Sequence, residues 1–143
     1  MFLSIPFFNE VNYAAVFVAA LAYFILGALW YSVLFQKIWS KGITEMGIKM
    51  AMPDKGKMGM MMLKSFLANL LCAFALAFII RLDAAYRLET GIKLGIVCGA
   101  GITLASQMMG ANWIGTKRSV LMVDAAYQIL GVILCCVIIS VWH

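Results

Sequence analysis

Four long apolar segments dominate the pattern of hydrophobic and polar positions along the chain. They cover about residues 11–35, 63–82, 91–113 and 120–142. A helix needs about 20 apolar residues to cross roughly 30 Å of hydrocarbon, and the segments lack the apolar–polar alternation of barrel strands. The pattern therefore predicts an all-α, polytopic membrane protein, a single domain over residues 1–143 that folds as a four-transmembrane-helix bundle.

The only sizeable predicted loop lies between the first two segments, at about residues 36–62. Its helix-breaking residues argue against one long helix: Gly42, Gly47, Pro53, Gly56 and Gly59. Apolar residues recur in its first half at near-helical spacing, which favours a short helix on the membrane surface. Pro53-Asp54 is typical of a helix start, and a helix that begins there would run on into the second segment.

The overall composition excludes a water-soluble domain. The chain is 65% hydrophobic and 12% charged, whereas soluble domains are about 45–50% apolar and about 25% charged. We expect the first segment to be retained rather than cleaved as a signal peptide, because residues 1–10 contain no Lys or Arg.

Basic residues are distributed unevenly between the two sides of the predicted bundle. Eight of the eleven lie in or beside the first and third loops: Lys37, Lys41, Lys49, Lys55, Lys57, Lys64, Lys117 and Arg118. The opposite side has Arg81, Arg87 and Lys93. The positive-inside rule then predicts cytoplasmic loops at 36–62 and between the third and fourth segments, with both termini extracytoplasmic. This asymmetry accounts for the net charge of +5, so no nucleic-acid partner is expected.

Aromatic residues favour the same boundaries. Trp30, Tyr31 and Trp39 lie at the end of the first segment, and Trp113 lies at the end of the third. Amphipathic rings prefer the headgroup zone of a bilayer, so we interpret these residues as interfacial anchors.

A weak internal repeat relates the two halves of the chain. Gly27-Ala28-Leu29-Trp30 and Gly110-Ala111-Asn112-Trp113 end the first and third segments. Lys64-Ser65-Phe66-Leu67 and Arg118-Ser119-Val120-Leu121 open the second and fourth. The pattern is typical of two parallel hairpin repeats, and chance similarity in a restricted alphabet is the alternative.

Three stretches of the chain resemble a known family. They are Gly27-Ala28-Leu29-Trp30-Tyr31-Ser32 with Asn12-Tyr13 before it, Phe35-Gln36-Lys37-Ile38-Trp39, and Val123-Asp124-Ala125-Ala126-Tyr127-Gln128 followed by Gly131 and Trp142. Together they resemble the domain of unknown function 1761 family of small, mostly bacterial membrane proteins. That family often has a Ser-Pro step where this chain has Ser32-Val33, so we expect no kink there. The resemblance implies a four-helix protein of the bacterial inner membrane. The family has no assigned activity, so the resemblance supplies no catalytic residue.

Small residues are frequent in the third segment. Gly91, Gly95 and Gly99 lie four residues apart on one stripe, and Gly101, Ala105, Ser106 and Gly110 follow. Glycine stripes permit close approach of a second helix backbone. We interpret the stripe as packing within the chain, with a homo-oligomer interface as the alternative.

Asp124 is the only acidic residue inside a predicted span, and it shares one helix face with Gln128, Gly131 and Cys135. The predicted orientation places four further polar residues at a similar depth: Lys64, Asn69, Gln107 and Asn112. An intramembrane acid marks either a site for a proton, ion or substrate, or a buried ion pair that fixes the register of the helices. Both hypotheses stay open.

Other chemistry is weakly indicated. Seven Met residues between positions 46 and 62 offer soft ligands for Cu(I), but without His or Cys beside them they favour an adaptable membrane-facing surface. The cysteines Cys72, Cys98, Cys135 and Cys136 lack metal-ligand spacing and are expected to pack as small side chains. The sole histidine is His143, and no hydrolase, metalloprotease or phosphate-binding motif is present. We expect no enzyme activity, metal site or cofactor.

The sequence therefore predicts a non-enzymatic membrane protein that acts through contacts with lipid, with itself as a homo-oligomer, or with another membrane protein. A small transporter or channel subunit that uses the Asp124 cluster is the second hypothesis. The third is an enzyme accessory or sensor whose Lys- and Met-rich loop meets anionic lipid or a soluble partner.

Overall fold

The computed structural model describes residues 5–49, 53–84 and 86–142, and these residues form helices and no strand. The elements in chain order, with η denoting a π-helical stretch, are α1 (Ile5–Glu10), α2 (Tyr13–Leu29), η1 (Trp30–Leu34), α3 (Gln36–Glu45), α4 (Lys55–Asp83), α5 (Leu88–Ile96), η2 (Val97–Thr103), α6 (Leu104–Ile114) and α7 (Arg118–Val141). The predicted all-α class is confirmed.

Within the part of the chain that the structure describes, four helical units are long and apolar enough to cross a membrane. They are Tyr13–Leu34, formed by α2 and η1; Lys55–Leu82 of α4; Leu88–Ile114, formed by α5, η2 and α6; and Arg118–Val141, which is α7. Each exceeds the roughly 20 residues that the hydrocarbon core of a bilayer requires. The predicted four-helix architecture is confirmed, whereas the two parallel hairpin repeats stay a prediction.

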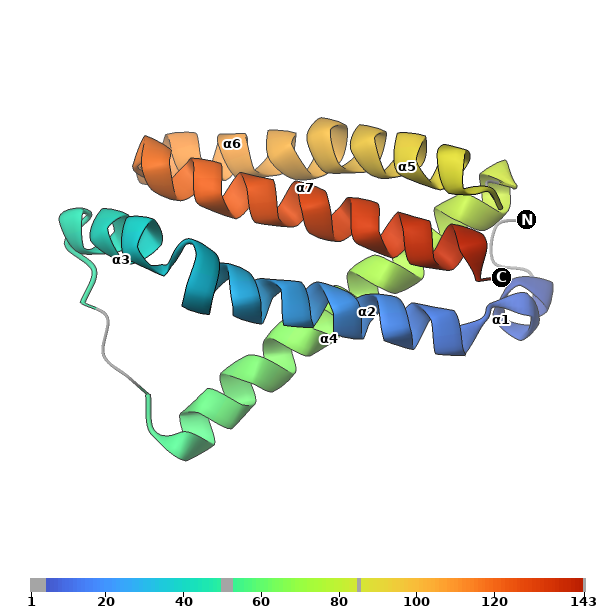
Figure 1. Ribbon diagram of the computed structural model, residues 1–143, viewed down its shortest axis with the longest axis horizontal. Helices are drawn as coiled ribbons and strands as arrows, with labels where there is room; N and C mark the ends of the chain where they lie inside the picture. Colours follow the sequence, from blue (N-terminus) through green and yellow to red (C-terminus); the bar gives the residue numbers. More distant parts are fainter. Residues whose placement is uncertain (1–4, 50–52, 85, 143) are drawn as a thin grey trace.

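The last helix, α7, is the centre of the bundle. Figure 1 shows α5 and α6 along one side of α7 and α2 along the other, with α4 crossing α2 at a steep angle. Helix α1 and the last turn of α7 lie at one end, which we call the terminus end, and α3 lies at the opposite end, which we call the α3 end. Because α4 is oblique, its first turns diverge from α2 toward the α3 end.

Side-chain caps fix where two of the long helices begin. The Ala15 N–H donates to Asn12 Oδ1 at 3.1 Å, and the Lys57 N–H donates to Asp54 Oδ1 at 2.8 Å. Such bonds satisfy N–H groups that the first turn of a helix leaves without a partner. The cap at Asp54 explains why α4 begins at Lys55 rather than near residue 63, because the apolar run marks only the part of the helix that is suited to hydrocarbon.

A short helix, α3, occupies the first part of the predicted loop and packs on the start of α7. Gly42 is buried against α7, where an added Cβ would collide with Val120. An ion pair joins Glu45, at the end of α3, to Lys117, just before α7. The loop therefore folds back onto the bundle. Two of its methionines, Met50 and Met52, lie outside the described residues.

The glycines of α5 and η2 face α7. A Cβ added to Gly91 would lie 2.7 Å from Ser140 Oγ, and one added to Gly95 would lie 2.7 Å from Ile133 Cα. A Cβ added to Gly99 would lie 3.2 Å from Ile129 Cα. The two helices approach this closely because these three positions lack side chains. The stripe is therefore used for packing within one chain.

Two tyrosines and two glycines join α2 to α7 reciprocally. A Cβ added to Gly131 would collide with the ring of Tyr23. A Cβ added to Gly27 would lie 2.7 Å from Tyr127 Oη. The two rings meet edge to face, with centroids 5.2 Å apart. Residues 22–27 and 126–131 share the pattern Ala-Tyr-x-Ile-Leu-Gly. Because α2 and α7 run in opposite directions, the same four-residue spacing makes the same contact twice.

Candidate functional site

Two aromatic donors bind Asp124 near the α3 end of α7. Tyr31 Oη donates to Asp124 Oδ1 at 2.6 Å, and Trp39 Nε1 donates to the same oxygen at 3.0 Å. A carboxylate oxygen has two lone pairs and accepts both hydrogen bonds. Since Tyr31 belongs to η1 and Trp39 to α3, Asp124 is the residue at which three elements meet.

The π-helical turn of η1 lets two consecutive residues reach α7. Trp30 is buried and donates its Nε1 hydrogen to the Val123 carbonyl at 3.0 Å, while the next residue, Tyr31, bonds Asp124. Consecutive side chains of a regular α-helix point about 100° apart and face different neighbours. The extra residue of a π-turn changes this register, and such turns are frequent at functional sites.

Four aromatic rings form a continuous row beside Asp124. The ring centroids are 5.2 Å apart for Trp39 and Tyr31, 5.3 Å for Tyr31 and Tyr127, and 5.2 Å for Tyr127 and Tyr23. Each pair packs edge to face, which contributes about 0.5–1.5 kcal/mol beyond the buried area. We call the set of Trp39, Tyr31, Asp124, Tyr127, Tyr23 and Gln128 the aromatic–polar seam.

The polar groups of the seam bond one another. Tyr23 Oη donates to Gln128 Oε1, and Tyr127 Oη donates to the Tyr23 carbonyl at 3.4 Å. Asn69, on α4, forms a further hydrogen bond with the side chain of Tyr127. Polar groups without partners are costly in a low-dielectric interior. Pairing them within the seam therefore stabilises the contact of α2 and α4 with α7.

The structure brings together half of the polar cluster predicted from the sequence. Asp124, Gln128 and Asn69 belong to or contact the seam. Lys64 and Asn112 are exposed on α4 and α6. The buried Oε1 of Gln107 has no hydrogen-bond donor among the described residues. Asp124 forms none of the ion pairs found between described residues, and neutral donors take that place.

Sequence reasoning missed the partners of Asp124. It interpreted Tyr31 and Trp39 as interfacial anchors and assigned no role to Tyr23 or Tyr127. A signal for the two tyrosines is present in the repeated Ala-Tyr-x-Ile-Leu-Gly pattern of the first and fourth spans. No comparable signal exists for Trp39, because its bond depends on α3 folding back onto α7.

A groove of about 410 Å³ lies beside the seam, between α2 and the diverging part of α4. Tyr31, Ser65, Asn69 and Tyr127 supply its polar lining, and the remaining lining residues are Phe24, Gly27, Ala28, Met58, Met61 and Met62. Tyr31 belongs to both the groove and the seam, whereas Asp124 is not among the described residues that line the groove. The phenol of Tyr31 therefore connects the Asp124 carboxylate to the groove.

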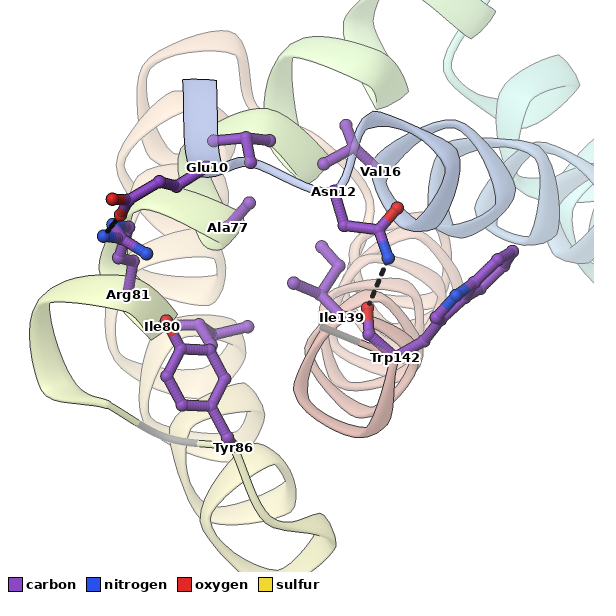
Figure 2. A pocket seen from close by; sticks show the side chains of 10 residues that line it. Glu10, Asn12, Val16, Ala77, Ile80, Arg81, Tyr86, Ile139 and Trp142 are labelled. Atoms are coloured by element: carbon purple, nitrogen blue, oxygen red, sulfur yellow. Dashed lines mark hydrogen bonds and ion pairs between the residues drawn. The ribbon is translucent and has the colours of Figure 1, made fainter. Parts of the chain in front are cut away.

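A second cavity, of about 300 Å³, lies at the terminus end, and we call it the terminus pocket. Figure 2 shows the ion pair of Glu10 and Arg81 on one side of it, and the hydrogen bond from Asn12 Nδ2 to the Trp142 carbonyl on the other. Apolar side chains lie between them: Val16, Ala77, Ile80 and Ile139. This pocket combines a charged rim with an apolar floor.

These features define the chain as a small all-helical protein with four helices of membrane length, whose first and last spans are joined by a buried aromatic–polar seam. The family model described as protein of unknown function (DUF1761) matches residues 14–140, and the chain belongs to this family. The resemblance found in the sequence is thereby confirmed. No curated protein and no solved structure matches the chain.

Proposed function

We propose that the chain is an integral membrane protein that acts without catalysis, by binding a second copy of itself through η2 and α6. One observation carries the proposal: this span turns some of its small and polar residues outward, although Gly91, Gly95 and Gly99 already pack on α7. The aromatic–polar seam supports it indirectly, because Asp124 and Gln128 are bonded by side chains of the same chain.

The outward face of this span carries a second stripe. Gly101, Ala105, Met108 and Asn112 recur at spacings of four, three and four, and all are exposed. A Cβ added to Gly101 would meet nothing within 4 Å. In hydrocarbon, helices associate where small residues let backbones approach and where amides bond across the contact. This stripe supplies both features.

A second copy is the partner that this stripe fits best. The amide of Asn112 has two donor hydrogens and an acceptor oxygen, so it can bond the same residue of another copy across a two-fold axis. A hollow of about 410 Å³ adjoins the stripe and offers room for a side chain of that copy. Its lining residues are Met108, Ala111, Asn112, Gly115, Thr116, Arg118 and Leu121. Two identical surfaces that meet about a two-fold axis form a closed dimer.

We further propose that the chain lies in the bacterial inner membrane with its α3 end in the cytoplasm. Support comes from charge. Five basic residues belong to this end: Lys37 and Lys41 on α3, Lys55 at the start of α4, Lys117 just before α7, and Arg118 at the start of α7. Basic residues accumulate on the cytoplasmic side of membrane proteins.

Cysteine cross-linking in native membranes tests the self-association. Ala105→Cys places a thiol on the proposed contact, and Leu71→Cys places one on α4, where Leu71 is 71% exposed. Oxidation should yield a covalent dimer from Ala105→Cys and little from Leu71→Cys. The unmodified chain, whose four cysteines lie in the spans, gives the background.

A further variant tests the role of the amide. Asn112→Leu should lower the cross-linked fraction of Ala105→Cys, because interhelical bonds of this type contribute about 1–2 kcal/mol, roughly a tenfold change in association. Equal cross-linking at positions 105 and 71 would indicate random collision and would refute the proposal. Absence of a dimer from both variants would refute it as well.

A second candidate function, transport of a proton, cation or small substrate, is favoured by the groove that reaches Tyr31 beside Asp124. It predicts that proteoliposomes of the wild-type chain carry a flux that Asp124→Asn abolishes while the fold is retained. Wild-type proteoliposomes without flux would eliminate this candidate and leave the self-association proposal unaffected.

A further inference from the structure

The terminus pocket has a closed apolar floor. Val16 and Ile80 are 3% and 1% exposed, and Ala77 and Ile139 are also buried. These residues come from α2, α4 and α7, so three spans build the floor. The volume of about 300 Å³ lies at the lower end of the roughly 300–1,000 Å³ of ligand pockets. The space suits part of one alkyl chain rather than a whole lipid.

The rim of the pocket carries one positive and one negative charge. Arg81 and Glu10 form an ion pair there, and both side chains remain partly exposed. A guanidinium has five donor hydrogens and a carboxylate has two acceptor oxygens, so a single contact leaves both groups with further bonding capacity. The rim can therefore bind an anionic and a cationic group side by side, and it carries no net charge.

The position of the pocket along the helices matches the headgroup zone of a bilayer. Arg81 lies in the last turn of α4, and Trp142 directly follows α7. Tyr86 and Trp142 both line the pocket, and amphipathic rings of this kind prefer the membrane–water interface. A molecule bound in the pocket would therefore meet charged groups at the depth of the lipid headgroups and apolar side chains at the depth of the hydrocarbon.

We propose that the terminus pocket binds a zwitterionic phospholipid of the surrounding leaflet, phosphatidylethanolamine being the simplest case. Its phosphate bonds Arg81, its ammonium bonds Glu10, and the first part of one acyl chain lies against Ala77, Ile80 and Ile139. An anionic lipid such as phosphatidylglycerol has no ammonium group and places its phosphate beside the Glu10 carboxylate. The paired rim therefore selects between these two lipids.

Native mass spectrometry of the full chain in detergent, with the two lipids added in turn, tests the selection. Phosphatidylethanolamine should bind roughly tenfold more tightly than phosphatidylglycerol, the change expected for one hydrogen bond to a charged group. Glu10→Gln with Arg81→Gln should abolish this preference. The matched control is Glu89→Gln with Lys93→Gln, which removes the exposed ion pair of α5 and should leave the preference intact.

The apolar floor is tested separately. Ala77→Phe fills the pocket and should prevent the lipid adduct, whereas Ala75→Phe, at an exposed position of the same helix, should not. Exposed ion pairs contribute little to folding, so the rim variants decide the matter if Ala77→Phe does not fold. Equal binding of the two lipids would refute the proposal. Displacement of the bound lipid by soluble glycerophosphoethanolamine, which has no acyl chain, would refute the role of the floor.

Discussion

Gly95→Ala should destabilise the protein, because the contact between α5 and α7 leaves no room for a methyl group at this position. The new Cβ would lie 2.7 Å from Ile133 Cα, 3.1 Å from its Cγ1 and 3.3 Å from its Cβ. The closest of these atoms is backbone, so a rotamer change of Ile133 does not relieve the clash. The two helices must move apart by several tenths of an ångström along their shared face.

The size of the effect follows from two opposing contributions. Overpacking of a well-packed contact costs about 1–3 kcal/mol, and atoms that separate by 0.5–1 Å lose roughly a quarter to a half of their dispersion attraction. In the opposite direction, replacing Gly by Ala within a helix stabilises the helix by up to about 1 kcal/mol. We therefore expect a net loss of about 1 kcal/mol or more in the free energy of unfolding.

Two further glycines provide a graded series. At Gly99 the closest approach is 3.2 Å, so Gly99→Ala should have a smaller effect. At Gly59, within α4, an added Cβ meets nothing within 4 Å, and Gly59→Ala should be neutral or stabilising. Unfolding in mixed detergent micelles, followed by far-UV circular dichroism, measures all three. A Gly95→Ala protein as stable as the Gly59→Ala protein would refute this account of the α5–α7 contact.

Three further predictions concern the aromatic–polar seam and the topology. Asp124→Leu should lower the free energy of unfolding by about 1–3 kcal/mol, because it leaves the Tyr31 hydroxyl and the Trp39 N–H without an acceptor; Asp124→Asn, which keeps an acceptor oxygen, should lose less, and equal losses would contradict this role of the carboxylate. Trp39→Phe should speed amide hydrogen exchange throughout α3, whereas Trp113→Phe, at a position 88% exposed, should not; unchanged exchange in α3 would show that the indole bond does not hold this helix. A reporter that is active only in the cytoplasm should give a signal from the loop at 36–62 and none from the C-terminus, and the reverse result would overturn the orientation.

The architecture is readable from the sequence because a bilayer imposes a minimum length on every apolar span. The start of α4 is readable from the Pro53-Asp54 step and not from the apolar run, which begins several residues later. Lys55, Gly56, Lys57 and Gly59 are poor candidates for hydrocarbon, and only the cap at Asp54 indicates that the helix already includes them.

The aromatic–polar seam can be predicted from the sequence only in part. Helical periodicity places Asp124 and Gln128 on one face, and the structure brings both to the contact with α2. Their partners depend on tertiary structure: Tyr31 reaches Asp124 from a π-helical turn, and Trp39 reaches it because α3 folds back. Lys64 is expected near Asp124 because of its predicted depth in the membrane, but it is exposed on α4. Depth in the membrane does not determine which side of a helix a residue occupies.

The contact between α2 and α7 has a consequence for biosynthesis. Tyr23, Trp30 and Tyr31 donate their side-chain hydrogens to Gln128, Val123 and Asp124, all on α7, which leaves the ribosome after α2. Until that helix is inserted, the first span lies in hydrocarbon without these acceptors, where unpaired donors are costly. Folding therefore is not completed helix by helix. A nascent chain that stops before α7 exposes three polar donors to lipid, and this distinguishes it physically from a chain in which α7 is inserted.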